Sequence, residues 1–180
     1  PVITIDAQLT ADNTPELTGT VDDPGASVTI EVDGQSIAAT NVGDGTWVLA
    51  DDLLTALSDG IYDVTASAED LVGNIGQDAT TDELTVDTTA PQITLNGDAT
   101  LSLVVGVDTY NEAGANALDA LDATVPVVIG GDVVDTDAIG TYVVTYDATD
   151  DAGNQATQQI RTVNVVAGGE GEGEGEGEGE

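Results

Sequence analysis

Residues 59–74 read DGIYDVTASAEDLVGN, and residues 139–154 read IGTYVVTYDATDDAGN. Aligned without a gap, the two stretches share Gly, Tyr, Val, Thr, Ala, Asp, Gly and Asn at matching places. Such self-similarity in a chain of 180 residues indicates two related domains, each with a small core, in place of one large domain. Each copy ends in the same kind of acidic turn, at 70–74 and 150–154, and specific chemistry is expected there first.

The apolar residues recur with a period of two. Residues 28–32 (VTIEV) and 62–68 (YDVTASA) alternate apolar and polar side chains, which predicts half-buried antiparallel strands. Turn signals separate such stretches, for example Asp-Pro-Gly at 23–25 and Asp-Gly at 33–34. The pattern predicts an all-β sandwich or barrel. The stretches 51–58 and 111–121 are expected to be loops or short 3₁₀ turns.

The domain boundary is visible as a repeated beginning. Residues 86–91 (VDTTAP) lead into QITL, just as the chain opens with PVITI. We therefore expect domain 1 at residues 1–87 and domain 2 at residues 88–167. The Gly-Glu alternation at 168–180 has no apolar group to bury and repels itself, which predicts a disordered spacer. Because the chain opens on Pro1 without Met, we expect it to be a piece of a longer protein.

The charge is strongly one-sided. There are 35 acidic residues and one basic residue, Arg161, for a net charge of −34. Residues 1–167 hold 29 of the acidic residues and the arginine, so the expected folded part carries −28. This field repels nucleic acid and anionic membranes and attracts cations. It suits either cation binding or adaptation to high salt. No apolar stretch reaches the length of a membrane span, and no signal peptide is recognisable.

The amino-acid composition excludes several kinds of catalysis and cross-linking. The chain has no Cys, His, Lys or Met, so thiol, imidazole and amine catalysis are absent, as are disulfides. Lysine-based isopeptide cross-links are excluded for the same reason. We therefore expect a protein that is not an enzyme.

Both halves carry motifs of known domain families. The first half resembles the bacterial immunoglobulin-like repeats of large secreted adhesins, through residues 14–20 (TPELTGT), 45–47 (GTW), 59–62 (DGIY), 70–74 (DLVGN) and 87–91 (DTTAP). The second half resembles another bacterial immunoglobulin-like type, found in surface proteins and secreted hydrolases, through residues 91–97 (PQITLNG), 140–146 (GTYVVTY) and 150–154 (DDAGN). The resemblance covers residues 1–166 and implies two tandem immunoglobulin-like β-sandwiches. It also implies calcium at domain junctions, as in adhesin repeats.

The resemblance brings specific carboxylates together. In such a sandwich the loops between strands B and C and between F and G lie at the pole of the domain's own N-terminus, facing the preceding domain. The expected metal ligands at the junction are Asp87, Asp119, Asp122, Asp150 and Asp151. A second set at the first domain, facing a further neighbour, is Asp22, Asp23, Glu69 and Asp70. Oxygen ligands without His or Cys favour Ca²⁺. The alternative is that Asp-x-x-Gly-Asn is only a tight turn whose Asp binds nearby amides.

The few aromatic residues are expected to serve the fold. Trp47 is predicted to fill a core, and Tyr62 and Tyr142 to act as corner tyrosines that bond back to main chain. Tyr110 and Tyr146 remain unassigned, which is too little for a sugar-binding platform.

The sequence thus predicts a non-catalytic extracellular spacer or stalk module of a bacterial surface or secreted adhesin-like protein, stiffened by Ca²⁺ at the junction. Its expected partners are neighbouring immunoglobulin-like domains of the same longer chain, with no nucleic acid and no membrane insertion. One alternative is an accessory module that binds a cell-surface glycan or protein. Another is a subunit of a filament or surface layer, assembled through an edge strand or the tail.

Overall fold

The structure, a computed structural model, describes residues 1–78 and 80–168. The predicted spacer at 168–180 therefore lies, apart from Gly168, outside the described residues. Every regular element of the described chain is a β-strand, which confirms the all-β class. No helix in this part is long and apolar enough to span a membrane. Residue contacts divide the chain into two compact units, each described by itself below.

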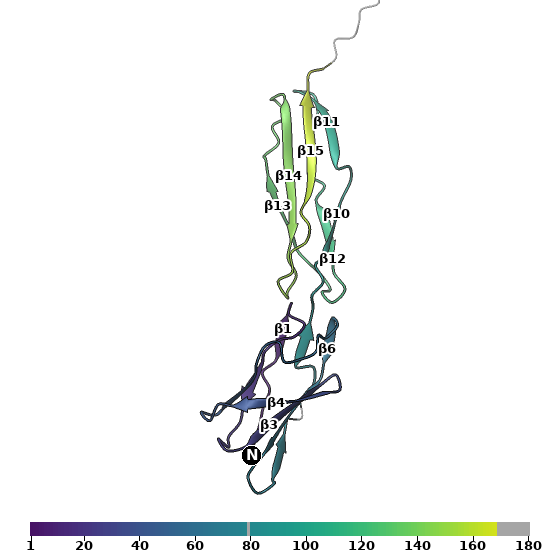
Figure 1. The fold of residues 1–180 in the computed structure, drawn as a ribbon. Helices are drawn as coiled ribbons and strands as arrows, with labels where there is room; N and C mark the ends of the chain where they lie inside the picture. The colour runs from purple at the N-terminus through teal and green to yellow at the C-terminus, as the bar shows by residue number, and fades with distance from the viewer. Residues whose placement is uncertain (79, 169–180) are drawn as a thin grey trace, which may run out of the picture. The chain divides into compact units, whose positions relative to one another are not determined.

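The first unit comprises residues 1–91 together with two short segments, 118–125 and 149–155. It contains a six-stranded sheet of order β2-β5-β4-β3-β7-β8 and a three-stranded sheet of order β1-β9-β6 (Figure 1). The strands are β1 (Gln8–Thr10), β2 (Leu17–Thr20), β3 (Ser27–Val32), β4 (Gln35–Asn41), β5 (Thr46–Leu49), β6 (Gly60–Tyr62), β7 (Val64–Glu69), β8 (Ile75–Gln77) and β9 (Leu84–Val86).

The hairpin between β3 and β4 follows directly from the sequence. Val32 pairs with Gln35, so only Asp33 and Gly34 form the loop. Both have positive φ, 47° and 74°, as a two-residue turn that matches strand twist requires. The alternation in β3 then turns Val28, Ile30 and Val32 inward.

The core of the first unit gathers the inward residues of both sheets. Trp47 is 1% exposed, as predicted, and its indole N–H donates to the Thr4 carbonyl at 2.9 Å. Gly19 lies against this ring, because a Cβ there would come within 2.7 Å of the indole nitrogen. The core also includes Ile3, Leu17, Val21, Leu49, Leu54, Leu57, Val64, Leu84 and Val86.

Within the described residues, the second unit comprises 92–117, 126–148 and 156–168. A four-stranded sheet has the order β11-β15-β14-β13, and β10 pairs with β12 in a two-stranded sheet. The long strands β14 and β15 run side by side in Figure 1, with β13 and β11 beside them. The bounds are β10 (Gln92–Leu95), β11 (Thr100–Val104), β12 (Ala115–Leu118), β13 (Val127–Gly131), β14 (Gly140–Ala148) and β15 (Gln159–Val166).

Both predicted corner tyrosines are present. The Tyr62 hydroxyl donates to the Ser58 carbonyl at 2.7 Å, and the Tyr142 hydroxyl donates to the Ala138 carbonyl at 3.1 Å. In each unit the acceptor lies four residues upstream. The repeat in sequence is therefore also a repeat in structure.

One expectation about local structure was wrong in part. Residues 111–121 do not form only loops, since β12 occupies Ala115–Leu118 and pairs with β10. Its Ala-rich composition hides a strand that tertiary pairing stabilises. The stretches expected to be antiparallel strands do pair that way, as β3 with β7, whereas β1 pairs with β9 and β11 pairs with β15 in parallel.

Candidate metal centre

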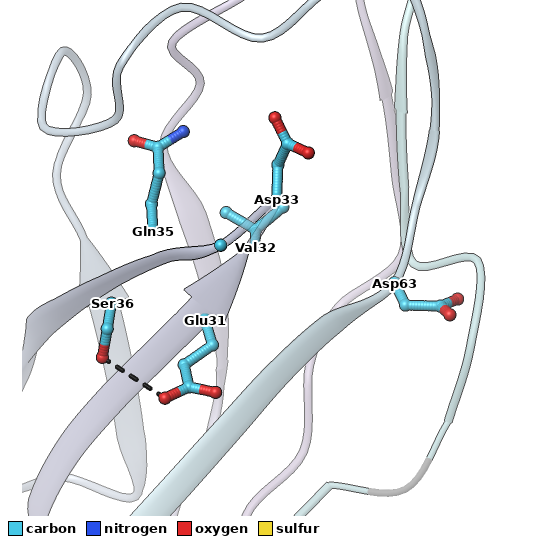
Figure 2. A pocket seen from close by; sticks show the side chains of 7 residues that line it. Glu31, Val32, Asp33, Gln35, Ser36 and Asp63 are labelled. Atoms are coloured by element: carbon cyan, nitrogen blue, oxygen red, sulfur yellow. Dashed lines mark hydrogen bonds between the residues drawn. The ribbon is translucent and has the colours of Figure 1, made fainter.

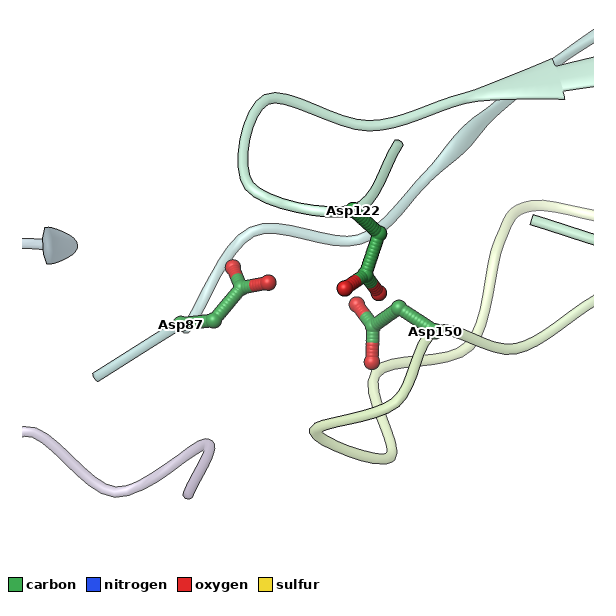
Figure 3. Close-up of side chains that lie close together, drawn as sticks. All are labelled: Asp87, Asp122 and Asp150. Carbon is green, nitrogen blue, oxygen red and sulfur yellow. The ribbon is translucent and has the colours of Figure 1, made fainter. Parts of the chain in front are cut away.

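Three of the expected ligands lie together in the first unit. Asp87, Asp122 and Asp150 each offer one carboxylate oxygen, and these oxygens all lie within 4.8 Å of one another. Figure 3 shows the three side chains directed into one common space, with Asp122 and Asp150 adjacent. Asp87 follows β9, Asp122 lies in the segment 118–125, and Asp150 lies in the segment 149–155. Residues distant in sequence therefore converge on a single point.

Asp87 is held by the parallel pairing of β1 and β9. Its N–H donates to the Thr10 carbonyl at 2.9 Å, which extends that pairing by one residue. One carboxylate oxygen accepts the Thr89 N–H at 3.1 Å. The residue is 1% exposed, so its charge is removed from water.

Asp150 is held by the turn that the sequence repeat marks. Its Oδ1 accepts the Asn154 N–H at 2.7 Å, and its Oδ2 accepts the Asn154 side-chain amide at 2.9 Å. Gly153 closes the turn with a φ of 98°, a conformation that favours glycine. The Asn154 amide also donates to the Asp87 carbonyl at 2.7 Å. The turn is thereby fastened to the segment that carries Asp87.

The segment 118–125 contributes a fourth carboxylate next to the cluster. Asp122 Oδ2 accepts the Asp151 N–H at 2.9 Å, so Asp151 takes part through its main chain. Asp119 Oδ1 accepts the Leu121 N–H at 2.9 Å, whereas Asp119 Oδ2 is buried without a hydrogen-bond partner. A buried carboxylate oxygen without a partner is costly, which is expected where a ligand supplies the missing contact.

The cluster is electrostatically uncompensated. Burial is the main cause that raises the pKa of Asp87, and the charges of Asp119, Asp150 and Asp59 raise it further. The one basic side chain of the sequence, Arg161, instead pairs with Glu112. At an effective dielectric constant of about 20, two like charges about 5 Å apart repel by roughly 3 kcal/mol. A cation among the three carboxylates relieves this repulsion.

The donor set fits a hard divalent cation. Ca²⁺ takes six to eight oxygens from carboxylates, carbonyls and water, and it tolerates irregular geometry. Asp87, Asp122 and Asp150 supply the core of such a set, and Asp119 stands beside it. The residues contain no nitrogen or sulfur ligand of the kind that transition metals prefer.

The set expected at the first domain is arranged differently. Within residues 1–78 and 80–168, Asp22, Asp23, Glu69 and Asp70 do not form a group of closely spaced carboxylates. Asp22 accepts the Val2 N–H at 2.7 Å, and Asp23 accepts the Gly25 N–H at 2.8 Å. Asp70 is saturated by its own turn, which lowers its pKa chiefly through the Asn74 side chain. Metal binding by these four residues remains a prediction without geometric support.

A separate acidic pocket of about 290 Å³ lies beside the β3–β4 hairpin. Glu31, Asp33 and Asp63 contribute carboxylates to its lining, together with Gln35 and Ser36. Figure 2 shows Glu31 hydrogen-bonded to Ser36, while the Asp63 side chain points away from the other lining residues. The three carboxylates are therefore not arranged around a common point.

Sequence reasoning missed a polar network in the second unit. Arg161 is 1% exposed, pairs with Glu112, and donates to the Tyr146 hydroxyl at 2.7 Å and the Asp98 carbonyl at 3.0 Å. Tyr110 and Tyr146 also donate to Glu112. The signal was present, because alternation in β15 puts Arg161 in phase with the buried Val163 and Val165. This network ties β15 to the segments that carry Asp98 and Glu112.

Comparison with known families identifies the class. Residues 4–88 match the bacterial Ig-like domain family, and residues 93–165 match the family described as bacterial surface protein, Ig-like domain. The chain is therefore a tandem of two bacterial immunoglobulin-like domains. No curated protein matches it.

Solved structures with related architecture are distant. The fibronectin(III)-like modules of CbhA from Clostridium thermocellum align over 92% of this chain and 95% of theirs, at 14% identity and a TM-score of 0.48. A structure from a 1.5-MDa bacterial ice-binding adhesin aligns over 91% of this chain and 65% of its own, at 18% identity and 0.44. A tetra-tandem repeat from the extending region of a large adhesion protein aligns over 92% of this chain and 49% of its own, at 21% identity and a TM-score of 0.36. At these values no property of those proteins is assigned to this chain.

Proposed function

We propose that this chain is a non-catalytic spacer module of an extracellular bacterial surface or adhesin-like protein, and that Ca²⁺ bound by Asp87, Asp122 and Asp150 stiffens it. The folding domains of this proposal are residues 1–87 and 88–167. Its partners are neighbouring immunoglobulin-like domains of a longer chain. The family description of the second half, a bacterial surface protein domain, supports the location.

The observation that carries the proposal is the convergence of the three carboxylates. Two of them, Asp87 and Asp150, are 1% and 7% exposed, and the partnerless oxygen of Asp119 is buried beside them. Surface acids in a highly charged chain have no reason to be buried together. Buried charges are normally paired or coordinate a metal.

The mechanical effect follows from the chain connections. The segments 118–125 and 149–155 lie between β12 and β13 and between β14 and β15, respectively. An ion shared by Asp122, Asp150 and Asp87 ties both segments to the end of β9. Without the ion, mutual repulsion of the carboxylates weakens this tie. Calcium thereby restricts how domain 2 moves with respect to domain 1.

The distribution of aromatic residues favours the spacer over a glycan-binding module that relies on aromatic stacking. Trp47 and Tyr146 are buried, and Tyr62, Tyr110 and Tyr142 are half-buried. The hydroxyls of these tyrosines bond to main-chain carbonyls or to Glu112. No aromatic face in the described residues forms an exposed platform.

The test of the metal site is a calorimetric melt of the chain in chelator, CaCl₂ and MgCl₂ at matched ionic strength. Binding to the folded state alone stabilises it by about 2.7 kcal/mol at roughly a hundredfold excess over Kd. We expect a calcium-selective rise in Tm that Asp87→Asn and Asp150→Asn each remove. Asp151→Asn is the matched control, because it removes one charge from the same turn without touching the three clustered carboxylates. The same Tm in chelator, CaCl₂ and MgCl₂ would contradict the proposal.

Stiffening is tested separately by small-angle scattering. We expect the distribution of interatomic distances to narrow when calcium replaces chelator, and Asp87→Asn to abolish that change. Identical scattering in both conditions, together with a calcium-dependent Tm, would leave a metal site that has no mechanical role.

A further inference from the structure

The strand β13 has a neighbour on one side only. It lies at the edge of the four-stranded sheet beside β14, and no described strand pairs with its other side (Figure 1). Just beyond β13, the Asp132 N–H donates to the Val143 carbonyl at 2.8 Å. Hydrogen-bonded residues alternate along an antiparallel pair, so in this register Val128 also bonds to β14. The N–H and C=O groups of Val127 and Ile129 therefore point to the free side.

The six-stranded sheet of the first unit has its edges covered, in contrast to β13. Beside β2, the Thr4 N–H donates to the Thr20 carbonyl at 2.9 Å. Beside β8, a Cβ on Gly76 would lie 1.9 Å from the Pro1 carbonyl oxygen. Proteins protect edges that stay uncovered with charged side chains or proline, because a bare edge invites another strand. The sequence of β13, VVIGG, contains neither.

A groove of about 390 Å³ lies beside the free side of β13. Its apolar lining comes from Ile129, Val133, Val134 and Val144. Val144 is buried, but Val133 is 90% exposed. The volume lies within the usual range of about 300–1,000 Å³ for sites that bind ligands.

Ile129 shows that the groove is a gap in the cover of the core. It pairs with Tyr146 of β14, and residues directly opposite each other lie on the same face of a sheet. Tyr146 is 0% exposed, whereas Ile129 is 47% exposed. The core face of β13 is therefore left uncovered, and an added strand would cover it.

The charges around the groove restrict what can bind there. Asp132 and Glu112 take part in its lining, and Asp147 is exposed opposite Val128. The one basic side chain of the sequence, Arg161, is buried and paired with Glu112. A second copy of this chain, with its net charge of −34, would bring mainly negative charge to this edge, as would its Gly-Glu segment. Charge complementarity therefore selects a basic occupant.

We propose that β13 accepts an extended segment of another protein as an added strand, and that apolar side chains alternate with lysine or arginine in this segment. Its main chain bonds to the free groups of Val127 and Ile129, and an apolar side chain enters the groove. The basic side chains lie on the opposite face of the sheet, where Asp147 is exposed. Main-chain bonds give such complexes affinity, and pockets for alternate side chains give them specificity. This goes beyond the proposed spacer role and does not depend on the calcium site.

The test measures binding of fluorescent peptides to the full chain at about 0.15 M NaCl, the physiological ionic strength. One peptide alternates lysine and valine. A second has the same sequence with N-methylated valines, which keeps the charge but removes the N–H groups that would face β13. We expect the first to bind at least about tenfold more tightly, the factor that one buried apolar side chain and its strand pairing supply. Equal affinities would show charge attraction alone and would overturn the proposal.

A third peptide tests the charge of the occupant. It alternates glutamate and valine, so it keeps the strand pattern and reverses the charge. We expect no binding, because the acids around the groove repel it. Binding as tight as that of the lysine peptide would overturn the assignment of a basic partner.

Val133→Asp separates the groove from general charge attraction. It removes an apolar side chain from the lining and adds a negative charge, so plain attraction of a basic peptide would increase. We expect binding of the lysine peptide to weaken by about tenfold instead. The matched control is Leu71→Asp, at a position 92% exposed in the first unit, which should leave the affinity unchanged. Unchanged or tighter binding by Val133→Asp would overturn the proposal.

Ile129→Pro tests the strand edge itself. Proline is tolerated in an edge strand where the N–H faces solvent, so the variant should fold, which circular dichroism checks, and should lose binding. If it does not fold, amide exchange of the parent decides: the Ile129 N–H should exchange fast in the free chain and slowly with the lysine peptide, and the Val128 N–H slowly in both. Fast exchange at Ile129 with peptide bound would overturn the proposal. Self-association of the free chain that Ile129→Pro abolishes would make a second copy the occupant and would overturn it too.

Discussion

Asp87 carries a carboxylate that the fold buries beside other acidic side chains, which makes its negative charge unfavourable. Burial and neighbouring acids raise its pKa, so Asp87 holds its proton up to a higher pH in the folded state than in the unfolded chain. A group whose pKa rises on folding contributes stability at low pH, and that contribution disappears as pH rises through the folded-state pKa. In the metal-free chain at neutral pH, ionised Asp87 is therefore destabilising.

We therefore expect Asp87→Asn to change the free energy of unfolding in opposite directions in chelator and in calcium. In chelator at neutral pH the variant should unfold with a free energy higher by roughly 1 kcal/mol, a typical single-residue effect, because the buried charge is gone. In calcium it should be less stable than the parent, because a ligand is gone. Denaturant unfolding in both buffers measures the two differences. Destabilisation in chelator would show that the hydrogen bond from the Thr89 N–H to the carboxylate outweighs the cost of the buried charge.

The pH dependence gives a second check on the same residue. The advantage of Asp87→Asn in chelator should shrink as pH falls through the raised pKa of Asp87, because protonation then removes the charge from the parent as well. An advantage that stays constant with pH would exclude the charge as its cause.

Glu112 presents the opposite case. Burial opposes its ionisation, but hydrogen bonds from Tyr110, Tyr146 and the Gly114 N–H, with the charge of Arg161, lower its pKa from 4.5 to about 2. Its contribution is therefore complete above pH 4.5 and lost as pH falls towards 2. Glu112→Gln leaves a buried guanidinium unpaired, and we expect a loss of about 3 kcal/mol at neutral pH.

Denaturant unfolding measures this loss. The matched control is Asp137→Asn, which removes one negative charge from an exposed position of the same unit. A loss no larger than that of the control would mean that Arg161 is adequately solvated without Glu112. The loss should also fade on acidification, since the parent then loses the same charge.

Among the elements, the sequence allowed strands and turns with strong local signals to be predicted. Alternation predicted β3 and β7, Asp33-Gly34 fits its two-residue loop, and the repeated Tyr positions predicted both tyrosine corners. β12 was missed because Ala-rich residues carry no alternation, and pairing with β10 decides their conformation. The parallel pairs were missed because period two is the same in parallel and antiparallel strands.

The candidate metal site was also predicted only in part from the sequence. Asp87, Asp122 and Asp150 were among the nine expected ligands, and the structure brings them together, while their metal binding stays a prediction. Asp22, Asp23, Glu69 and Asp70 satisfied the same sequence argument without converging. Analogy between repeats predicted which loops share a pole, but not which side chains meet there. The buried Glu83, whose Oε2 accepts the Val64 N–H at 2.9 Å, had no sequence signal at all.

The end of β13 gives a prediction at the element scale. Gly131 has a φ of 84°, and a Cβ there would lie 2.3 Å from the Val143 carbonyl oxygen of β14. Gly131→Ala must therefore displace the β13–β14 pairing. Gly106→Ala is the control, because its φ of 67° imposes a similar backbone penalty with nothing within 4 Å of the new methyl group.

We expect Gly106→Ala to lower the free energy of unfolding by about 1–2 kcal/mol, the penalty of the left-handed conformation. Gly131→Ala should lower it by roughly 1–3 kcal/mol more, as for an overpacked site. Denaturant unfolding followed by circular dichroism compares the two. If the two variants lose the same free energy of unfolding, the end of β13 can move to accommodate the new methyl group without cost.

At the scale of the whole molecule, the net charge predicts a strong effect of monovalent salt. A Debye length of about 10 Å at 0.1 M falls to about 3 Å at 1 M, which screens repulsion among exposed carboxylates. We expect Tm in chelator to rise continuously with NaCl, equally for the parent and for Asp151→Asn. A melt insensitive to NaCl would show that the surface charges are spaced too widely to matter, and would argue against adaptation to high salt.

The burial of Arg161 has a consequence for resistance to proteolysis. Proteases of trypsin type cut after lysine or arginine, and this chain offers them a single bond, following Arg161. That residue lies 1% exposed inside β15, between β11 and β14. Cleavage there tracks the population of chains in which the strand has left its sheet. Trypsin-type proteases therefore cannot cut the chain while β15 stays in its sheet. The rate of cleavage after Arg161 measures how often the second unit opens.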